Sequence, residues 1–196
     1  MKVMVVGGGG REHAVVKKLS ESSRCTKLYA APGNAGIAAM AECLPIKATD
    51  VDAIVAAAIE KKCDLVFVTP DDPLMLGCVD KLEALGIPCF GPDAKAAIIE
   101  GSKAFSKNLM KKYGIPTASY EIFTELDAAL TYLDTAPIPT VVKADGLALG
   151  KGVIIAQTRD EAKDAVRSMM ADKVFGKSGD QIVIEEFLTG PEVSVL

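Results

Sequence analysis

The sequence predicts an α/β protein in which a parallel, doubly wound sheet is followed by a small α+β unit. In the first half, short aliphatic runs alternate with helical patterns, and continuous apolar runs such as residues 3–6 are typical of strands covered on both faces. In the second half, two strand patterns flank a glycine-rich loop, which indicates a hairpin-like connection. The 196 residues, 49% of them hydrophobic, suffice for one large or two small domains.

Strands and helices alternate in the first half. Strands are expected at residues 3–6, 27–30, 65–68 and 87–90, and helices at residues 11–19, 51–62 and 74–85. Thr49, with Asp52 three residues later, has the spacing of a capping box for the second helix. Gly86 is expected to end the third helix.

The second half has a different pattern. We expect the whole chain to divide into an N-terminal α/β domain at residues 1–101, a connecting helical segment at 102–122, a small α+β unit at 123–190 and the start of a truncated further part at 191–196. Helices are expected at residues 94–100, 102–113, 124–133 and 158–170, and strands at residues 119–123, on both sides of the loop 146–152, and at 181–188. Thr124 is expected to cap one helix, and Thr158 with Glu161 forms a second capping-box pattern. Residues 193–196 look like the start of another strand, and we therefore expect the chain to be part of a longer protein.

Composition excludes several classes of function. Charged residues make up 24% of the chain and the net charge is −4, so nothing global indicates nucleic-acid binding. No apolar run is long enough to span a bilayer and no secretory leader is recognisable, which predicts a cytoplasmic protein. The five cysteines lack Cys-x-x-Cys spacing, which favours reduced thiols. His13 is the only histidine, so a histidine-rich metal site is excluded.

The segment 141–153 is the most informative motif. Lys143 ends an apolar strand, where a charge is unfavourable unless it is paired, and Lys151 lies in the glycine loop that follows. Glycines allow the backbone to approach an anion, and lysines neutralise its charge. The loop is not a Walker motif, because a strand follows Lys151. Polyphosphate binding is favoured over a merely flexible hairpin loop.

The glycine run 7–10 follows a strand and opens a helix, where a phosphate would be stabilised. Glu12 stands where a dinucleotide fingerprint requires a third glycine, which favours a smaller phosphate ester over NAD or FAD. Arg11 is a candidate phosphate ligand, and His13 is assigned no proton transfer. The alternative is a tight turn that simply requires glycine.

Two further loops follow strands that should end at the same sheet edge, residues 32–36 and 69–74. Asn34 and Asp71 are candidates for binding sugar hydroxyls or an amine, although both residue types also serve turns and caps.

The run 182–188 places two carboxylates after three aliphatic residues, and adjacent strand residues point to opposite faces. One glutamate can therefore face a cleft, the backbone can read an adenine edge, and Phe187 or Leu188 can cover its face. Glu192 is a candidate for ribose hydroxyls. The alternative is an ordinary strand end with solvated acids.

Together these pieces resemble the phosphoribosylamine–glycine ligase family, also called glycinamide ribonucleotide synthetases, of the ATP-grasp superfamily. The resemblance covers the whole chain and rests on residues 7–13, 32–36, 91–92, 100–105, 142–153 and 185–188, in this order. It implies a Rossmann-like pre-ATP-grasp domain, then an ATP-grasp lid domain and an incomplete ATP-grasp core. The implied reaction is ATP-dependent joining of glycine to 5-phosphoribosylamine through a glycyl phosphate, in purine biosynthesis.

The resemblance also implies roles for individual residues. ATP would be bound by Lys103, Lys143, Gly146, Gly150, Lys151, Gly152, Glu185, Glu186, Phe187, Leu188 and Glu192. Phosphoribosylamine would be bound by Gly9, Gly10, Arg11, Glu12, Asn34, Gly36, Asp71, Pro73 and Leu74. Mg²⁺ is the expected second cofactor, but no residue here is assigned as its ligand. The complete protein is expected to be a monomer without nucleic-acid or membrane partners.

Two departures from the family pattern limit the expectation. Thr69-Pro70-Asp71 stands where the family usually has Gly-Pro-Glu. Family members are also about twice as long, and their additional part would bind glycine and supply the Mg²⁺ ligands, so we expect no turnover from this chain alone. Another ATP-grasp carboxylate–amine ligase, a non-catalytic nucleotide- or phosphosugar-binding module and a dinucleotide oxidoreductase are the alternatives.

Overall fold

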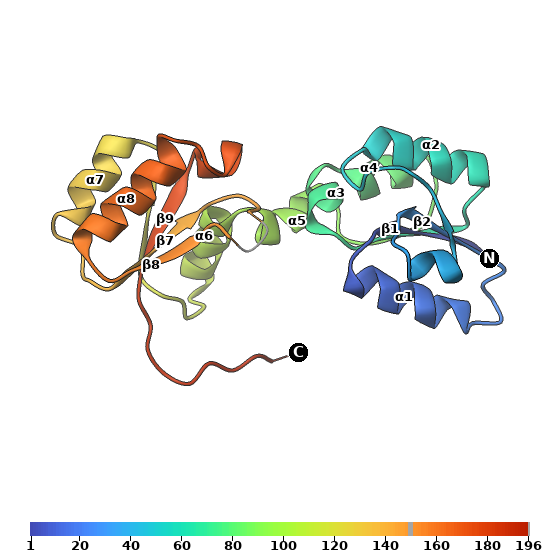
Figure 1. The fold of residues 1–196 in the computed structure, drawn as a ribbon, viewed down its shortest axis with the longest axis horizontal. Helices are drawn as coiled ribbons and strands as arrows, with labels where there is room; N and C mark the ends of the chain where they lie inside the picture. The colour runs from blue at the N-terminus through green and yellow to red at the C-terminus, as the bar shows by residue number, and fades with distance from the viewer. Residues whose placement is uncertain (149–150, 196) are drawn as a thin grey trace. The chain divides into compact units, whose positions relative to one another are not determined.

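The computed structural model of the protein describes residues 1–148 and 151–195 (Figure 1). The chain divides into two compact units, Met1–Ile98 and Ile99–Leu196.

The first unit is built on a parallel five-stranded sheet with the order β3-β2-β1-β4-β5. Its elements are β1 (Lys2–Gly7), α1 (Gly10–Ser20), β2 (Lys27–Pro32), η1 (Ile37–Ala39), β3 (Glu42–Cys43), α2 (Val51–Lys61), β4 (Leu65–Val68), α3 (Asp71–Met75), α4 (Cys78–Ala84), β5 (Cys89–Phe90) and the start of α5 (Ala94–Gly101). Helix α1 lies on one face of the sheet, and α2 and α4 lie on the other (Figure 1). The predicted doubly wound fold is confirmed.

The two faces of β1 explain its uninterrupted apolar sequence. Met4 and Val6 pack with residues of α2 and α4, whereas Val3 and Val5 pack with Val16 of α1. All four β1 side chains are at most 2% exposed. A strand covered on both sides has no position for a polar side chain.

Three local predictions in this unit were wrong. The helix expected at residues 74–85 is two helices, α3 and α4, separated at Gly77, whose φ of +75° lies in the left-handed region. Asp71 and Asp72 belong to the first turn of α3 rather than to a loop, where their charge suits the helix dipole. Asp50, rather than Thr49, caps α2, because its carboxylate accepts a hydrogen bond from Ala53 N at 3.1 Å.

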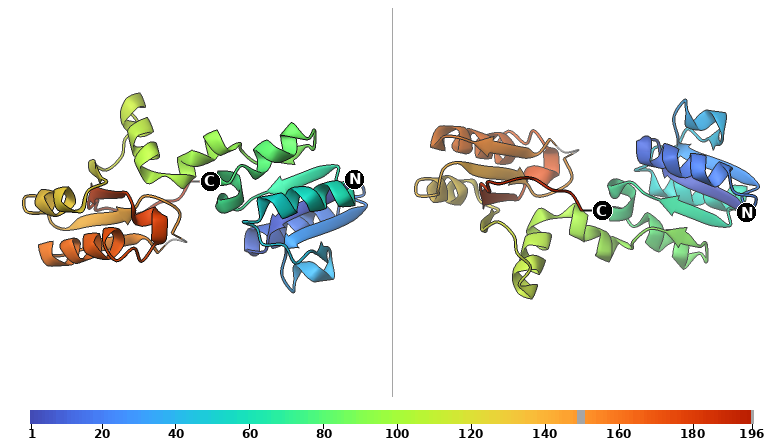
Figure 2. Two further views of the ribbon diagram at one scale, coloured as in Figure 1. Left: turned by 90° about the horizontal axis from the view of Figure 1, so that it is seen from above. Right: turned by 90° about the horizontal axis from the view of Figure 1, so that it is seen from below.

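The second unit contains an antiparallel four-stranded sheet with the order β6-β9-β7-β8. Its elements are α6 (Lys103–Tyr113), β6 (Tyr120–Phe123), α7 (Leu126–Leu133), β7 (Thr140–Ala144), β8 (Val153–Ala156), α8 (Arg159–Met170), η2 (Gly176–Gly179) and β9 (Ile182–Glu186). Helices α7 and α8 pack on one face of this sheet through a core that includes Leu133, Val142, Met169 and Ile184 (Figure 2). The opposite face carries the charged side chains of Lys143 and Glu185.

Of the two helix caps predicted in this unit, one is confirmed and one is wrong, and the last strand ends earlier than expected. Thr158 caps α8 as predicted, since its hydroxyl accepts a hydrogen bond from Glu161 N at 3.2 Å. The predicted cap at Thr124 was wrong, because α7 begins after Glu125 and has no side-chain cap. Strand β9 ends at Glu186, so Phe187 and Leu188 follow the strand instead of belonging to it. The described residues 193–195 are exposed and form no strand.

The five cysteines are free thiols. Burial raises the pKa of Cys63, Cys78 and Cys89 to about 11 in each case, which keeps these thiols protonated at neutral pH. Protonated thiols are poor nucleophiles, so we assign these three cysteines a role in packing rather than in chemistry.

The two threonines offer a matched test of helix capping. We expect Thr158→Ala to lower the free energy of unfolding by about 1 kcal/mol, because it removes the acceptor for Glu161 N. Thr124→Ala should change the free energy of unfolding by only about a few tenths of a kcal/mol, which is typical of substitutions at exposed positions that make no special contact. Urea unfolding of both variants measures the difference, and equal losses would contradict the assignment of the caps.

Candidate functional site

A groove of about 830 Å³ opens on the charged face of the second unit's sheet. Its floor is apolar, formed by Val141 of β7 with Val153 and Ile155 of β8. Six residues predicted to bind ATP line it: Lys143, Glu185, Glu186, Phe187, Leu188 and Glu192. Antiparallel register explains the grouping, because Val141 pairs with both Ile155 and Glu185, and alternate residues of one strand share a face.

Glu185 is the centre of a buried charge cluster. Its Oε2 atom lies 3.0 Å from Lys143 Nζ and 3.0 Å from Lys107 Nζ. The glutamate side chain is 6% exposed, and that of Lys107 is 8% exposed. One carboxylate therefore serves two ammonium groups, and the cluster has a net charge of +1.

Sequence reasoning missed Lys107. Among the four lysines of α6, nothing in composition marks it as buried, although it lies one helical turn after Lys103 and so on the same face. This spacing was the one available signal.

Lys103 contacts the start of the glycine loop. Its Nζ donates hydrogen bonds to the carbonyl oxygens of Asp145 at 3.3 Å and Gly146 at 3.1 Å. Burial lowers the pKa of Lys103; the carboxylate of Asp145 opposes this shift and the ammonium of Lys143 adds to it. The two predicted phosphate-binding lysines therefore affect each other electrostatically.

Asp145 is a second residue that sequence reasoning missed. Its carboxylate accepts hydrogen bonds from Ser102 Oγ, at 3.1 and 3.0 Å to the two oxygens, and from Ala104 N at 2.6 Å. It thus satisfies the N-terminus of α6 from the end of β7. The side chain of Asp145 fixes the lysine-bearing helix to the loop that carries Lys151.

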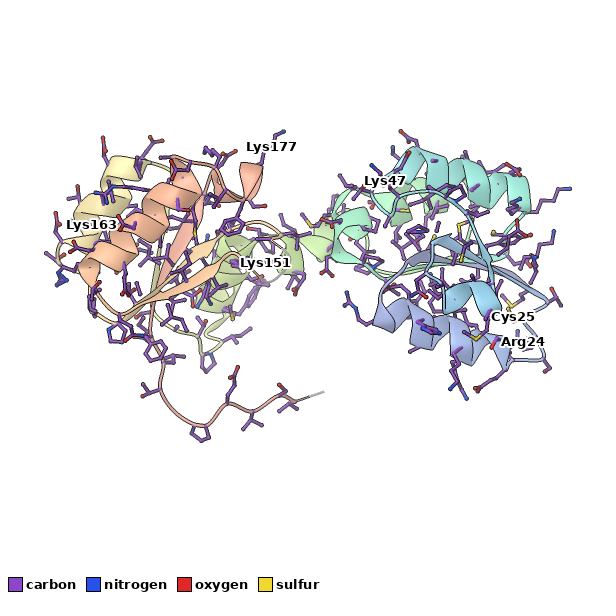
Figure 3. All side chains as sticks on the ribbon, viewed as in Figure 1. Arg24, Cys25, Lys47, Lys151, Lys163 and Lys177 are labelled. Atoms are coloured by element: carbon purple, nitrogen blue, oxygen red, sulfur yellow. The ribbon has the colours of Figure 1, made fainter. Side chains whose placement is uncertain are left out.

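The glycine loop is held at both described ends. Ser178 of η2 donates a hydrogen bond through Oγ to Leu147 O at 2.7 Å, and Gly152 O accepts one from Ala144 N at 2.8 Å. A Cβ at Gly146 would lie 2.6 Å from Ser178 Oγ and 3.1 Å from Ser178 Cα, so Ser178 would have to shift to admit a side chain there. Lys151 is exposed (Figure 3). The predicted ligand Gly150 lies outside the described residues.

In the first unit, Glu12 joins two loops at the carboxyl edge of the sheet. Its Oε2 accepts a hydrogen bond from Gly9 N at 2.6 Å, and its Oε1 accepts one from Thr69 Oγ1 at 2.9 Å. The residue is 4% exposed. Gly10 and Arg11, which precede it in α1, are exposed.

Asn34 connects the loops that follow β1 and β2. Its Nδ2 donates to Gly8 O at 2.9 Å, and its Oδ1 accepts from Ile37 N at 2.9 Å. A Cβ at Gly8 would lie 2.4 Å from the carbonyl oxygen of Gly33, so these backbones touch. Gly36 packs against the ring of His13, where a Cβ would lie 2.4 Å from Cε1.

The remaining predicted substrate residues lie in the first turn of α3. Pro73 and Leu74 are buried, whereas Asp71 is partly exposed. All predicted substrate residues belong to the first unit and all predicted ATP residues to the second.

Metal-binding clusters and membrane-spanning helices are both absent from the part of the chain that the structure describes. Residues 1–148 and 151–195 contain no group of three or more His, Cys, Asp or Glu side chains arranged to hold a metal ion. Within the same ranges, no helix combines the length and the apolar character needed to cross a membrane.

Comparison with known proteins defines the class. The family profile of the phosphoribosylglycinamide synthetase N domain matches residues 1–100, and that of the ATP-grasp (A) domain of the same synthetase matches residues 101–196. The two matches cover the chain from end to end. The chain belongs to the phosphoribosylglycinamide synthetase family.

Individual relatives agree with this assignment. Phosphoribosylamine–glycine ligase of Xanthomonas campestris is 51% identical over 198 aligned residues, which cover 100% of this chain and 46% of the relative. The crystal structure of phosphoribosylamine–glycine ligase from Thermotoga maritima matches with a TM-score of 0.77 and 27% identity, over 97% of this chain and 45% of that one. The chain thus spans about half the length of the relatives it matches.

A more distant structure shares the fold. The biotin carboxylase domain of 2-oxoglutarate carboxylase from Hydrogenobacter thermophilus, solved in complex with MgADP, matches with a TM-score of 0.75 and 21% identity. The match covers 95% of this chain and 44% of that one.

The glycine turn of the first unit generates a prediction. Gly8→Ala should lower the free energy of unfolding by about 1–3 kcal/mol, because the new Cβ would meet backbone that cannot give way locally. Gly10→Ala is the matched control: nothing lies within 4 Å of the position that its Cβ would take, and a helical Gly→Ala change should be neutral or stabilise by up to about 1 kcal/mol. Urea unfolding compares the two, and a Gly8→Ala variant as stable as Gly10→Ala would refute the contact.

Proposed function

We propose that this chain forms the ATP-binding and phosphoribosylamine-binding part of a phosphoribosylamine–glycine ligase. The complete reaction would phosphorylate the glycine carboxylate with ATP, and the amine of 5-phosphoribosylamine would then attack the glycyl phosphate. The products would be glycinamide ribonucleotide, ADP and phosphate. The observation that carries the proposal is the groove over β7 and β8, with the Lys143–Glu185 pair at its wall.

The groove suits a nucleotide by size and chemistry. Its volume of about 830 Å³ is within the usual range for small-molecule sites, and the apolar floor can pack against a base. Lys143 would neutralise phosphate charge, as would Lys103 beside the loop, while Lys151 would approach from the loop itself. The backbone of residues 185–188 would read adenine, and Glu192 would bind ribose hydroxyls.

The N-terminus of α1 supports binding of the ribose phosphate. Its N-cap is Gly9, which makes no side-chain cap, so the first-turn N–H groups of Gly10, Arg11 and Glu12 have no cap acceptor within the helix. These groups and the helix dipole favour a phosphate. Asn34 and Glu12 would then act mainly by holding the loops in place, because their polar atoms already bond to neighbouring loops.

The chemistry requires that charge be neutralised and water be excluded at the acyl phosphate. Residues of this chain would supply the first function through Lys103 and Lys143, and residues 123–190 would act as a lid over the nucleotide, following the proposed domain boundaries. Mg²⁺ would further neutralise the phosphate charge, and we assign its ligands and the glycine site to the part of the relatives that this chain does not cover. The complete enzyme is proposed to be a cytoplasmic monomer.

Calorimetric titration tests nucleotide binding by the chain. We expect ATP to bind and NAD not to bind, and Lys143→Met to weaken ATP binding by a factor of about 10 or more, as expected when a charge-assisted contact of roughly 1.5–3 kcal/mol is lost. Lys163→Met is the matched control, because Lys163 belongs to α8, pairs with Asp134 and does not line the groove.

Either of two results would contradict the proposal: NAD binding in preference to ATP, or equal ATP affinity of Lys143→Met and wild type. ATP binding without turnover is the result expected for this chain. Turnover after addition of the uncovered part of a relative would favour the ligase over a non-catalytic binding module.

A further inference from the structure

Lys107 is a buried lysine for which the proposed function has no role. Three oxygen atoms surround its Nζ: Thr117 Oγ1 at 2.8 Å, Ala118 O at 3.3 Å and Glu185 Oε2 at 3.0 Å. The first two contacts are hydrogen bonds and the third is an ion pair, so protein oxygen atoms account for the surroundings of this ammonium. Lys107 is not among the residues that line the groove. It is therefore unsuited to bind a ligand directly.

Lys143 is in the opposite situation. Its side chain is 26% exposed and lines the groove. Among the described residues its one hydrogen-bond partner is Glu185 Oε2, at 3.0 Å, so two of its donors remain for a ligand. The same carboxylate oxygen thus lies between a buried ammonium held by protein oxygen atoms and a second ammonium that is open to the groove.

The second carboxylate oxygen of Glu185 does not help to hold the side chain in place. Oε1 is buried and has no hydrogen-bond partner among the described residues. The carboxylate is thus held in place through Oε2 alone. Lys107 is itself held by hydrogen bonds to Thr117 and Ala118, which follow α6. Its ion pair with Oε2 therefore helps to fix the position of the carboxylate.

We propose that Lys107 is a positioning residue for nucleotide binding: it shares the Glu185 carboxylate, so that Lys143 is held less tightly by Glu185 and keeps its free donors directed to phosphate. This inference rests on the proposed function, in which Lys143 contacts ATP. Without Lys107, the undivided carboxylate would hold Lys143 more tightly, and the net charge of the cluster would fall from +1 to zero.

The first test needs no nucleotide. Trace acetylation with acetic anhydride, read by mass spectrometry, measures how readily each lysine of the folded 196-residue chain reacts. Lys107→Met should lower the labelling of Lys143 about threefold or more, because a side chain held more tightly by Glu185 is less accessible to the reagent and contacts in one charge network are coupled. Lys107→Arg should restore it, since the charge is kept.

Lys111→Met is the matched control for this test. Lys111 lies one turn further along α6, is exposed, and has its ammonium 6.0 Å from the ring of Tyr120, near which Lys107 Nζ also lies. Its loss should leave labelling of Lys143 unchanged. Unchanged or increased labelling of Lys143 in Lys107→Met would overturn the proposal, because a merely structural role would loosen the site and expose Lys143.

ATP titration gives the second test. Lys107→Met should weaken ATP binding by a factor of about 10, more than Lys111→Met does, while in a Glu185→Gln background the loss of Lys107 should have no larger effect than Lys111→Met. A larger loss in that background would show that Lys107 acts without Glu185 and would overturn the proposal. This comparison also decides the matter if Lys107→Met alone does not fold.

The two tests separate the two proposals. If wild type does not bind ATP, the proposed function fails, while acetylation still decides whether Lys107 controls Lys143. If wild type binds ATP but Lys107→Met behaves as Lys111→Met, the nucleotide site stands and the positioning role fails.

Discussion

The shared carboxylate of Glu185 is the interaction on which the groove of the second unit depends. A buried carboxylate is tolerated only when it is paired, and here two ammonium groups from different elements satisfy one oxygen. Pairing of β7 with β9 brings Lys143 to it, and α6 brings Lys107. Buried ion pairs contribute little net stability, because desolvation offsets their attraction, but breaking one leaves an uncompensated charge. The cluster therefore fixes how α6, β7 and β9 fit together more than it adds to stability.

Backbone contact plays the corresponding role in the first unit. Gly8 touches the carbonyl of Gly33, and Asn34 and Glu12 hold their loops through hydrogen bonds to neighbouring loops. Because Gly9 provides no side-chain cap, the first-turn N–H groups of α1 lack a cap acceptor, and we propose that an anion binds them. In both units, the groups that we propose to contact a ligand, Lys143 and the α1 N-terminus, differ from residues that hold other groups in place. Glu12 and Asn34, which the sequence suggested as ligands, are of this second kind, as are Lys107 and Asp145, which the sequence did not suggest.

The sequence was sufficient to predict the features that depend on a local pattern of residues. Strand β1 was recognisable because burial on both faces demands an uninterrupted apolar run. A charge at the end of such a run needs a partner, and the structure gives Lys143 the carboxylate of Glu185, whereas its contact with phosphate stays a prediction. Residues whose role depends on distant contacts were not predictable: Lys107 looks like any helix-surface lysine until β9 brings Glu185 to it, and Asp145 looks like a loop residue until α6 places its N-terminus there. The break at Gly77 was missed because the helical pattern continues across it and only the backbone conformation reveals the interruption.

The most direct test of the account is a crystal structure of this chain with a non-hydrolysable ATP analogue. We expect one nucleotide in the groove, with its base over Val141 and Ile155 and phosphate oxygens about 3 Å from the Nζ atoms of Lys103 and Lys143, the usual distance for such bonds. Lys107 should remain on Glu185. A nucleotide bound elsewhere, or a Lys107 that has left Glu185 to contact phosphate itself, would contradict it.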